Sequence, residues 1–196
     1  MTELHPLTIL FAAVFTNNIL LSNFLGMCPF VAVSGEIKTS LGMGQAVTFV
    51  LACTSVINYA VYHWILVPLE LDFIRFILFI LVIATFVQLV EMIIGRFFKE
   101  LSTSLGIFLP LITVNCAILG VSLFMVIREY NLIQTLFYGI GSGIGWTFAI
   151  VVMAGIRQKM KFSPMPEGLK GVGITFITAG IMALAFMAFS GLIKIQ

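Results

Sequence analysis

The chain has 196 residues, of which 61% are apolar and only 9% are charged, and its mean hydropathy is +1.17. A soluble domain of ordinary composition carries about 25% charged residues, so these values exclude a free cytosolic enzyme, a nucleic-acid-binding protein and a disordered tail. The net charge of +2 says little about partners. Lipid is the surrounding medium that such a sequence fits.

Six apolar runs are long enough to cross a bilayer as helices. A hydrocarbon core about 30 Å thick requires about 20 helical residues. Transmembrane β-strands would alternate polar and apolar residues, which these runs do not. In chain order the expected spans are Leu7 to Val33, Leu41 to Val67, Phe73 to Ile94, Leu101 to Ile127, Leu132 to Ile156 and Val172 to Ile193. The sequence therefore predicts an all-α membrane protein with six transmembrane helices and no soluble domain.

Basic residues are divided unevenly between the two sides of this arrangement. The poorer side has three, and the richer side has Lys38, Arg96, Lys99, Arg157, Lys159, Lys161 and Lys170. Because Lys and Arg are enriched in cytoplasmic loops, we expect the first, third and fifth loops in the cytoplasm and both termini outside. No basic residue precedes Lys38, so the first run lacks the start of a signal peptide and is expected to remain as a span.

Two similar windows indicate an internal repeat. Phe24 to Ser34 reads F-L-G-M-C-P-F-V-A-V-S, and Ile112 to Ser122 reads I-T-V-N-C-A-I-L-G-V-S. Both contain Cys-x4-Val-Ser, and each lies in the first span of one half of the chain. Because each half holds three spans, residues 1–95 and 96–196 are predicted to form two inverted three-helix repeats. Chance similarity between short apolar windows is the alternative.

Helix breakers flank both windows. Gly26 and Pro29 lie in the first, and Gly106 and Pro110 lie near the second. Proline removes a backbone donor, so we expect the first and fourth helices to be broken. Irregular backbone at membrane depth survives only where it is buried in protein or lines a cavity. Both cysteine segments are therefore expected to be interior.

The three cysteines differ in what their positions indicate. Cys53 has no counterpart in the other half and is expected to act as a small apolar residue. A pseudo-twofold axis in the membrane plane would bring Cys28 and Cys116 together at similar depth. A disulfide, a zinc site and an iron–sulfur cluster remain open as alternatives. The sequence around them offers no His or acidic ligand for zinc, and a cluster needs four thiolates, two of them from a partner of the same architecture.

Three stretches resemble the RnfA/NqrE family, and the similarity extends over essentially the whole chain: Asn17 to Phe30, Leu105 to Gly120, and Ile174 to Gly191. The resemblance implies a subunit of the ion-pumping Rnf or Nqr complexes of the bacterial plasma (inner) membrane, with both termini outside. It implies pairing with a homologous six-helix subunit of opposite topology, RnfE or NqrD. It also implies that Cys28 and Cys116 are ligands of a [2Fe-2S] cluster shared with that subunit, while flavins and NAD bind other subunits.

Within the family, two stretches favour each branch. Leu41 to Gly44 and Ile65 to Leu71 look like Rnf, whereas Gly141 to Trp146 and Ile156 to Lys161 are similar to Nqr. We favour Rnf, an ion-translocating ferredoxin:NAD oxidoreductase. The alternative is a NqrE-like subunit of a Na⁺-translocating NADH:quinone reductase. A secondary transporter is an alternative of another class, because inverted repeats and broken helices are also typical of transporters.

Several polar residues in the apolar spans are further candidates. Asn115 and Asn23 are positioned to hydrogen-bond the sulfurs of a cluster. Glu91, with Gln88 one turn earlier, is a candidate for an ion pathway; the alternative is a carboxylate that reaches the membrane surface near Arg96. The chain has no dinucleotide-binding fingerprint. We therefore expect no complete active site in this chain, only a part of an oxidoreductase complex.

Overall fold

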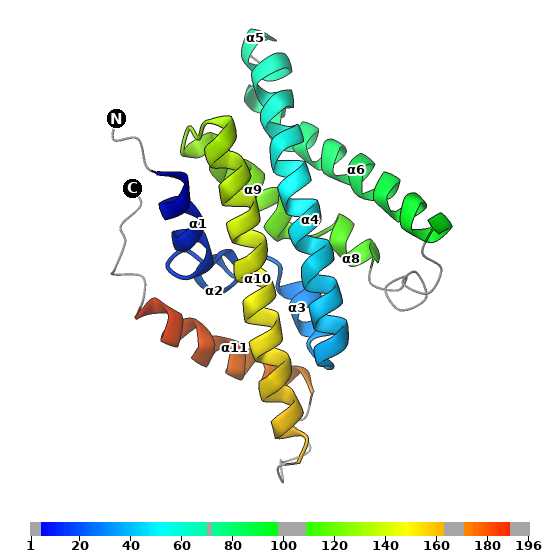
Figure 1. The fold of residues 1–196 in the computed structure, drawn as a ribbon, viewed down its shortest axis with the longest axis vertical. Helices are drawn as coiled ribbons and strands as arrows, with labels where there is room; N and C mark the ends of the chain where they lie inside the picture. The colour runs from blue at the N-terminus through cyan, green and yellow to red at the C-terminus, as the bar shows by residue number, and fades with distance from the viewer. Residues whose placement is uncertain (1–4, 70–71, 98–108, 163–170, 189–196) are drawn as a thin grey trace.

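The computed structural model describes residues 5–69, 72–97, 109–162 and 171–188, and all regular structure in these ranges is helical (Figure 1). The first half contains α1 (Pro6–Val14), α2 (Ile19–Asn23), α3 (Met27–Val33), α4 (Ile37–Val61), the π-helical turn η1 (Tyr62–Leu66), α5 (Val67–Leu69), the 3₁₀ turn η2 (Asp72–Ile74) and α6 (Arg75–Phe97). The second half contains α8 (Leu109–Thr113), α9 (Cys116–Ile127), α10 (Leu132–Met160) and α11 (Val172–Met187).

Four helical stretches within the described ranges are long and apolar enough to cross a membrane. They are Ile37–Leu69, Arg75–Ile93, Pro110–Ile127 and Leu132–Met160, and α11 is an apolar helix of shorter length. The prediction of an all-α membrane protein is therefore confirmed. The start of the fourth expected span and the end of the sixth lie outside the described residues. The six-helix count and the inverted repeat, with its division at residue 95, stay predictions.

The first expected span is divided into three short helices. Asn18 lies between α1 and α2, and its side chain is fully buried. Its Oδ1 accepts hydrogen bonds from the backbone N–H groups of Leu20 and Leu21, and its Nδ2 donates to the carbonyl oxygens of Val14 (3.1 Å) and Gly145 (2.8 Å). A single amide therefore satisfies the backbone groups that the break exposes. The second interruption follows at Phe24 (φ 54°) and Gly26 (φ 82°).

The fourth expected span is also interrupted, between α8 and α9. Asn115 is the N-cap of α9, and its Oδ1 accepts a hydrogen bond of 3.0 Å from the backbone N–H of Ala117. Breaks in the first and fourth helices are thus confirmed. The prolines act differently from a mid-helix kink: Pro29 and Pro110 lie in the first turns of α3 and α8. Proline is tolerated there because a first-turn N–H has no intrahelical partner.

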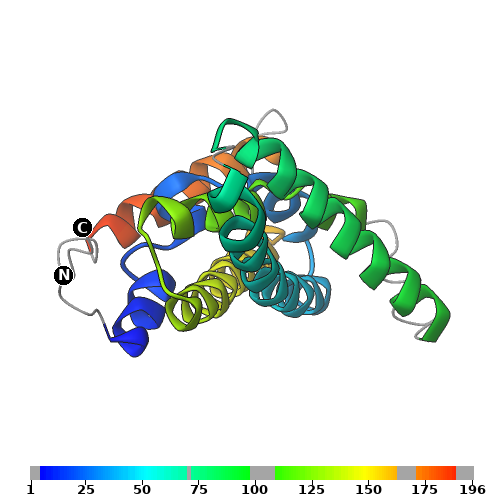
Figure 2. The same ribbon diagram turned by 90° about the horizontal axis from the view of Figure 1, so that it is seen from above.

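The core is an antiparallel contact between α4 and α10, which lie side by side in Figures 1 and 2. Small residues allow this close approach: a Cβ added to Gly143 would lie 2.7 Å from the Cα of Thr48. The hydroxyls of Thr48 and Thr147 are 3.1 Å apart across the same contact. Close packing at small residues and hydrogen bonds between helices are the usual means of association in a membrane, where burial from water gives no driving force.

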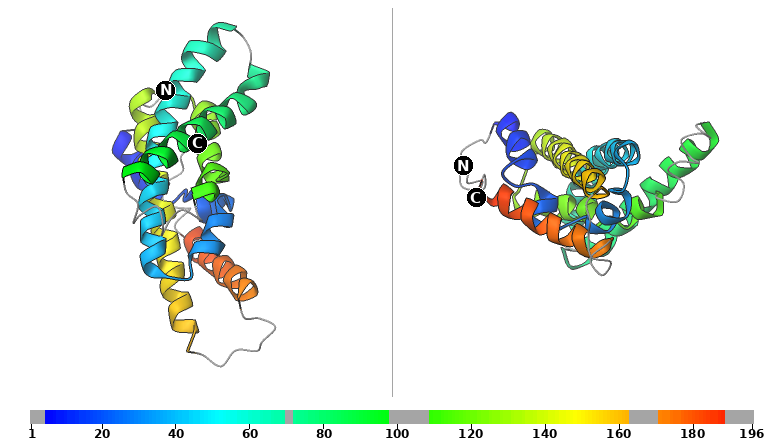
Figure 3. Two further views of the ribbon diagram at one scale, coloured as in Figure 1. Left: turned by 90° about the vertical axis from the view of Figure 1, so that its right-hand side faces the viewer. Right: turned by 90° about the horizontal axis from the view of Figure 1, so that it is seen from below.

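The remaining helices are arranged around this pair. Figure 2 shows α1 beside α10 in one layer, with α2, α3, α9 and α11 in a second layer behind. Figure 3 shows α6 diverging from the rest. It is held by a stripe of Phe79, Ile83 and Val87, each at most 3% exposed, whereas many of its other large side chains are exposed. The exposed face of α6 is suited to lipid or to another membrane protein.

Pro68 does not end the second span where the sequence suggested. The helix passes from α4 through η1 into α5, which ends at Leu69 and therefore contains Pro68. Proline cannot donate to the carbonyl four residues earlier, and the π-helical turn lies immediately before it. A local change of hydrogen-bond spacing of this kind accommodates an interrupted ladder without ending the helix.

Candidate thiol site at two helix breaks

Cys28 and Cys116 each lie directly after a helix break. Cys28 is the second residue of α3, and Cys116 is the first residue of α9. The preceding breaks are formed differently. The chain enters α3 through Gly26 in the left-handed region, whereas it enters α9 through the Asn115 cap. In both cases a residue of special backbone or capping chemistry fixes the start of the helix that carries the thiol.

The two breaks are in contact with each other. The backbone N–H of Gly26 donates a hydrogen bond of 2.9 Å to the Sγ of Cys116, although these residues are 90 positions apart. Cys28 follows Gly26 by two residues, and two residues of chain span at most about 7 Å. The structure therefore brings both thiol-bearing segments to one place. This contact is the geometric basis of the candidate site.

Glycine is required at position 26 for this contact. A Cβ on Gly26 would lie 2.7 Å from the Nε1 of Trp146, 3.0 Å from the Oδ1 of Asn115 and 3.1 Å from the Cβ of Ala117. Residues other than glycine also disfavour its positive φ of 82°. Close approach and backbone conformation thus both select glycine at the point where the two halves of the chain meet.

The thiols themselves are exposed on the surface of this chain. Cys28 and Cys116 are both free and exposed, whereas Cys53 is partly buried on α4. The expectation that both cysteine segments are interior is therefore wrong for this chain by itself. Their neighbours Pro29, Phe30 and Ala117 are buried and anchor the two segments. The inward-facing positions of α3 and α9 are filled by these neighbours, which leaves the cysteines on the outward face.

Two buried hydrogen-bond donors near this contact have no acceptor. The Nε1 of Trp146 and the Nδ2 of Asn115 are both buried and unpaired among the described residues. Trp146 is 0% exposed and comes from α10. Burying an unsatisfied donor costs about 1–3 kcal/mol. Sulfur acceptors at the thiol site would satisfy this donor set, so the residues present fit a thiolate-bound metal centre.

The described residues supply only part of such a centre. They contain no group of three or more His, Cys, Asp or Glu that could hold a metal ion. Two exposed thiols with no third or fourth ligand beside them correspond to half of a four-thiolate site. The same finding argues against a closed zinc site formed by this part of the chain, because structural zinc takes four ligands.

The other candidate residues lie in different places. Asn23 is the last residue of α2 and is exposed, so Asn115 is the asparagine that meets the thiol contact. Gln88 is exposed and Glu91 is half-buried on α6, which does not carry either thiol. The sequence-based reasoning missed Trp146. A signal for it was present, because Gly143 and Gly145 next to it indicate a close helix contact.

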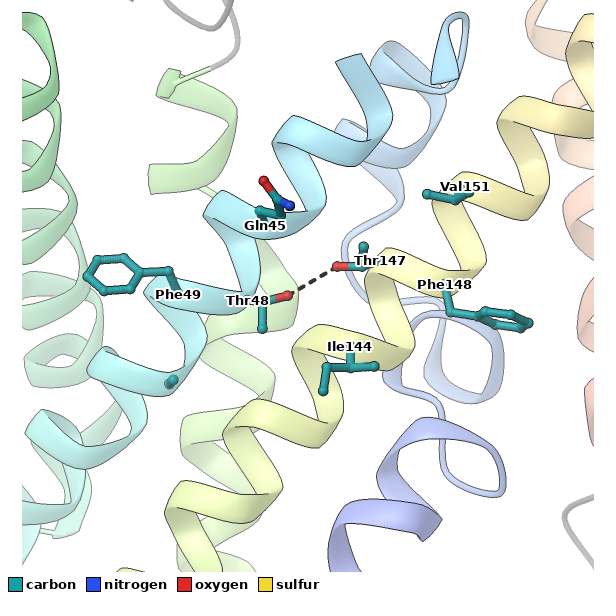
Figure 4. Close-up of a pocket in the computed structure, with 8 residues that line it drawn as sticks. Gln45, Thr48, Phe49, Ile144, Thr147, Phe148 and Val151 are labelled. Atoms are coloured by element: carbon teal, nitrogen blue, oxygen red, sulfur yellow. Dashed lines mark hydrogen bonds between the residues drawn. The ribbon is translucent and has the colours of Figure 1, made fainter. Parts of the chain in front are cut away.

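A second feature is the cleft of about 600 Å³ between α4 and α10 shown in Figure 4. Its lining includes Gln45, Phe49, Ile144 and Phe148 around the Thr48–Thr147 hydrogen bond. The lining is mostly apolar and contains no thiol and no charged side chain. It therefore offers no ligand for a metal, and the thiol contact remains the candidate site.

Fold and site together define an all-helical membrane protein that presents two thiols where interrupted helices meet. Residues 6–193 match the model of the family described as "Rnf-Nqr subunit, membrane protein". The chain therefore belongs to the Rnf-Nqr family, as its cysteine motifs predicted.

Relatives of high identity cover almost the whole chain. A protein of Psychromonas ingrahamii is 52% identical over 198 residues, which are 96% of this chain and 98% of the relative. One of Aeromonas hydrophila is 53% identical over 194 residues, and one of Pseudoalteromonas translucida is 52% identical over 198, both with the same coverage. Each is named as the E-type component of a "Na(+)-translocating NADH-quinone reductase". These names favour the Nqr branch over the Rnf branch that short stretches had suggested.

Proposed function

We propose that this chain is a NqrE-like electron-transfer subunit of a Na⁺-translocating NADH:quinone reductase, in which Cys28 and Cys116 hold half of a [2Fe-2S] cluster. The branch rests on relatives at 52–53% identity over 96% of the chain. The site rests on one observation, the 2.9 Å hydrogen bond from Gly26 N–H to Cys116 Sγ, which joins the two thiol-bearing breaks. This proposal replaces our preference for an Rnf ferredoxin:NAD complex.

The exposure of the thiols supports a shared site. A [2Fe-2S] cluster takes four thiolates, and this chain contributes two. Irregular backbone and exposed polar groups at membrane depth require protein cover, and Val114 beside the second break is 75% exposed. The proposed cover is a homologous six-helix subunit of opposite topology, of the NqrD type, which would supply the other two thiolates. Apolar exposed residues at the breaks would form its contact surface.

The residues of this chain then have defined tasks. Cys28 and Cys116 bind iron, the Gly26 N–H stabilises negative charge on the Cys116 sulfur, and Asn18 and Asn115 fix the helix breaks. The bound group would supply one-electron transfer inside the membrane, which divides an insulating layer of about 30 Å into two shorter steps. NADH, flavin and quinone are expected to bind other subunits.

The charges support the orientation with both termini outside. Lys38 near the start of α4 and Arg157 and Lys159 in the last turn of α10 lie at one end of the molecule (Figure 1). Arg75 and Arg128, at the start of α6 and after α9, lie toward the other end. With the richer end in the cytoplasm, the odd-numbered loops face inward.

The test compares three cysteine variants of the purified complex. Cys28→Ser and Cys116→Ser are each expected to lose the EPR signal of the cluster, two iron atoms per complex, and electron transfer from NADH to quinone. Cys53→Ser on α4 is the matched control and should retain all three. Wild-type iron content and spectra in the first two variants would contradict the proposal. Ion transport that persists without either thiol would favour the secondary-transporter alternative.

A further inference from the structure

The indole N–H of Trp146 is a buried donor without an acceptor. The side chain is 0% exposed, and its Nε1 has no hydrogen-bond partner among the described residues. Buried Trp N–H groups usually have a partner, since leaving one unpaired costs about 1–3 kcal/mol. The orphaned donor therefore indicates an acceptor that the described part of the chain does not contain.

The surroundings of this donor identify the place of the acceptor. α10 crosses the region where α2 and α9 meet and contacts both helices (Figure 1). Nε1 lies 2.7 Å from the position that a Cβ on Gly26 would occupy, and the N–H of the same Gly26 donates to Cys116 Sγ. The indole nitrogen is thus packed against the residue that contacts the thiolate ligand.

A second orphaned donor lies at the same glycine. The Oδ1 of Asn115 accepts from Ala117 N–H and lies 3.0 Å from the same Cβ position, while its Nδ2 is buried and unpaired. Two unpaired donors from different helices, α10 and the cap of α9, therefore converge beside one sulfur ligand. Such a concentration of buried donors calls for electron-rich acceptors.

We propose that Trp146 donates a hydrogen bond from Nε1 to a sulfur of the metal centre held by Cys28 and Cys116, with Asn115 Nδ2 as a second donor, and that these bonds raise its reduction potential. The inference rests on the proposed function. Reduction adds one electron and hence negative charge to the centre, and no bond between heavy atoms has to form or break. Donors directed at sulfur stabilise the more negative state, which raises the potential.

Trp146 is a tuning residue that acts through sulfur, so its test needs a redox readout. In the purified complex, Trp146→Phe keeps an aromatic ring and removes the N–H. EPR-monitored redox titration should show a lower potential, with the ratio of oxidised to reduced centre at fixed ambient potential raised about tenfold, or 59 mV for a one-electron couple. Asn115→Ser, which retains an oxygen for the cap, should shift the potential in the same direction.

The chain offers a matched control, because it has only two tryptophans. Trp64 lies in η1 and is 81% exposed. Trp64→Phe should leave the potential unchanged. A wild-type potential in Trp146→Phe with full iron content would overturn the inference.

A second measurement decides the question if Trp146→Phe fails to assemble. The complex is produced with tryptophan labelled with ¹⁵N at the indole nitrogen, in wild-type and Trp64→Phe forms, and the reduced centre is studied by pulsed EPR. Both samples should show a weak ¹⁵N coupling; its absence would overturn the inference. The two failures can be distinguished: an intact cluster without this coupling rejects the role of Trp146 alone. An EPR signal that survives Cys28→Ser and Cys116→Ser rejects the proposed function.

Discussion

Gly26→Ala is predicted to be one of the most damaging single-methyl additions in the described part of the chain. The residue has φ 82°, where an L-amino acid costs about 1–2 kcal/mol. The new Cβ would also lie 2.7 Å from Trp146 Nε1 and 3.0 Å from Asn115 Oδ1. Forcing additional volume into a packed site costs about 1–3 kcal/mol. The two terms together give a loss of about 2–5 kcal/mol.

The damage should be concentrated at the thiol contact. Relief of the crowding moves Gly26 or the loop before α9, and either movement lengthens the bond from Gly26 N–H to Cys116 Sγ. The purified complex should therefore show less iron per complex and a lower melting temperature. The matched control is Gly42→Ala on α4, where an added Cβ has no neighbour within 4 Å. If Gly26→Ala matched Gly42→Ala in iron content and melting temperature, the reasoning from close approach would be refuted.

Three further predictions concern the hydrogen bonds that hold the breaks and the helices. Asn18→Ala should destabilise the protein by about 2–3 kcal/mol, because it removes the α2 cap and two bonds to backbone carbonyls; in thermal unfolding, Asn17→Ala should cost less than half as much, and equal losses would contradict this account. Arg157→Gln removes donors to Val31 O and Ser34 Oγ at the end of α3 and should cost about 1.5–3 kcal/mol, whereas the exposed neighbour Lys159→Gln should stay within about 0.5 kcal/mol. Thr48→Val removes the bond to Thr147 and should lower stability by only about 0.6 kcal/mol, so a loss comparable to Asn18→Ala would show that polar groups contribute more at the α4–α10 contact than this value allows.

The sequence predicted much of the fold, because hydropathy and helix breakers act locally. Long apolar runs predicted the spanning helices, and Gly26, Pro29 and Pro110 indicated which spans are interrupted. The detailed roles of the prolines were not predictable from the same signal. A proline in an apolar run is compatible with a kink inside one helix and with the first turn of a new one. The interactions of Asn18 and Asn115, which end one helix and begin another, decide between these outcomes.

Burial was the property that the sequence could not predict. In a chain that is 61% apolar, hydrophobicity does not separate the lipid-facing residues from the interior. Trp64 and Trp146 illustrate this: one is 81% exposed and the other 0%. The same limitation explains the error on the cysteine segments, whose apolar surroundings suggested an interior location. The contact between Gly26 and Cys116 depends on tertiary packing over 90 positions, which no local pattern encodes.

The family could be recognised from the two cysteine motifs, but the branch could not. The stretches compared for Rnf and Nqr were short and apolar, and such segments diverge little between related membrane subunits. Identity of 52–53% over 96% of the chain sums many weakly informative positions and therefore carries more weight. Residues 163–170, which include part of the basic connection before α11, lie outside the described residues and add nothing to this decision.

The central claim is that two thiols of this chain and two of a partner subunit hold iron within the membrane. A density map of the intact, reduced complex, with iron located by anomalous scattering, tests it most directly. The account predicts iron within bonding distance of the Sγ atoms of Cys28 and Cys116, with two sulfurs of a neighbouring subunit completing the ligands. Iron absent from this place, or both Sγ atoms in contact with lipid alone, would contradict it.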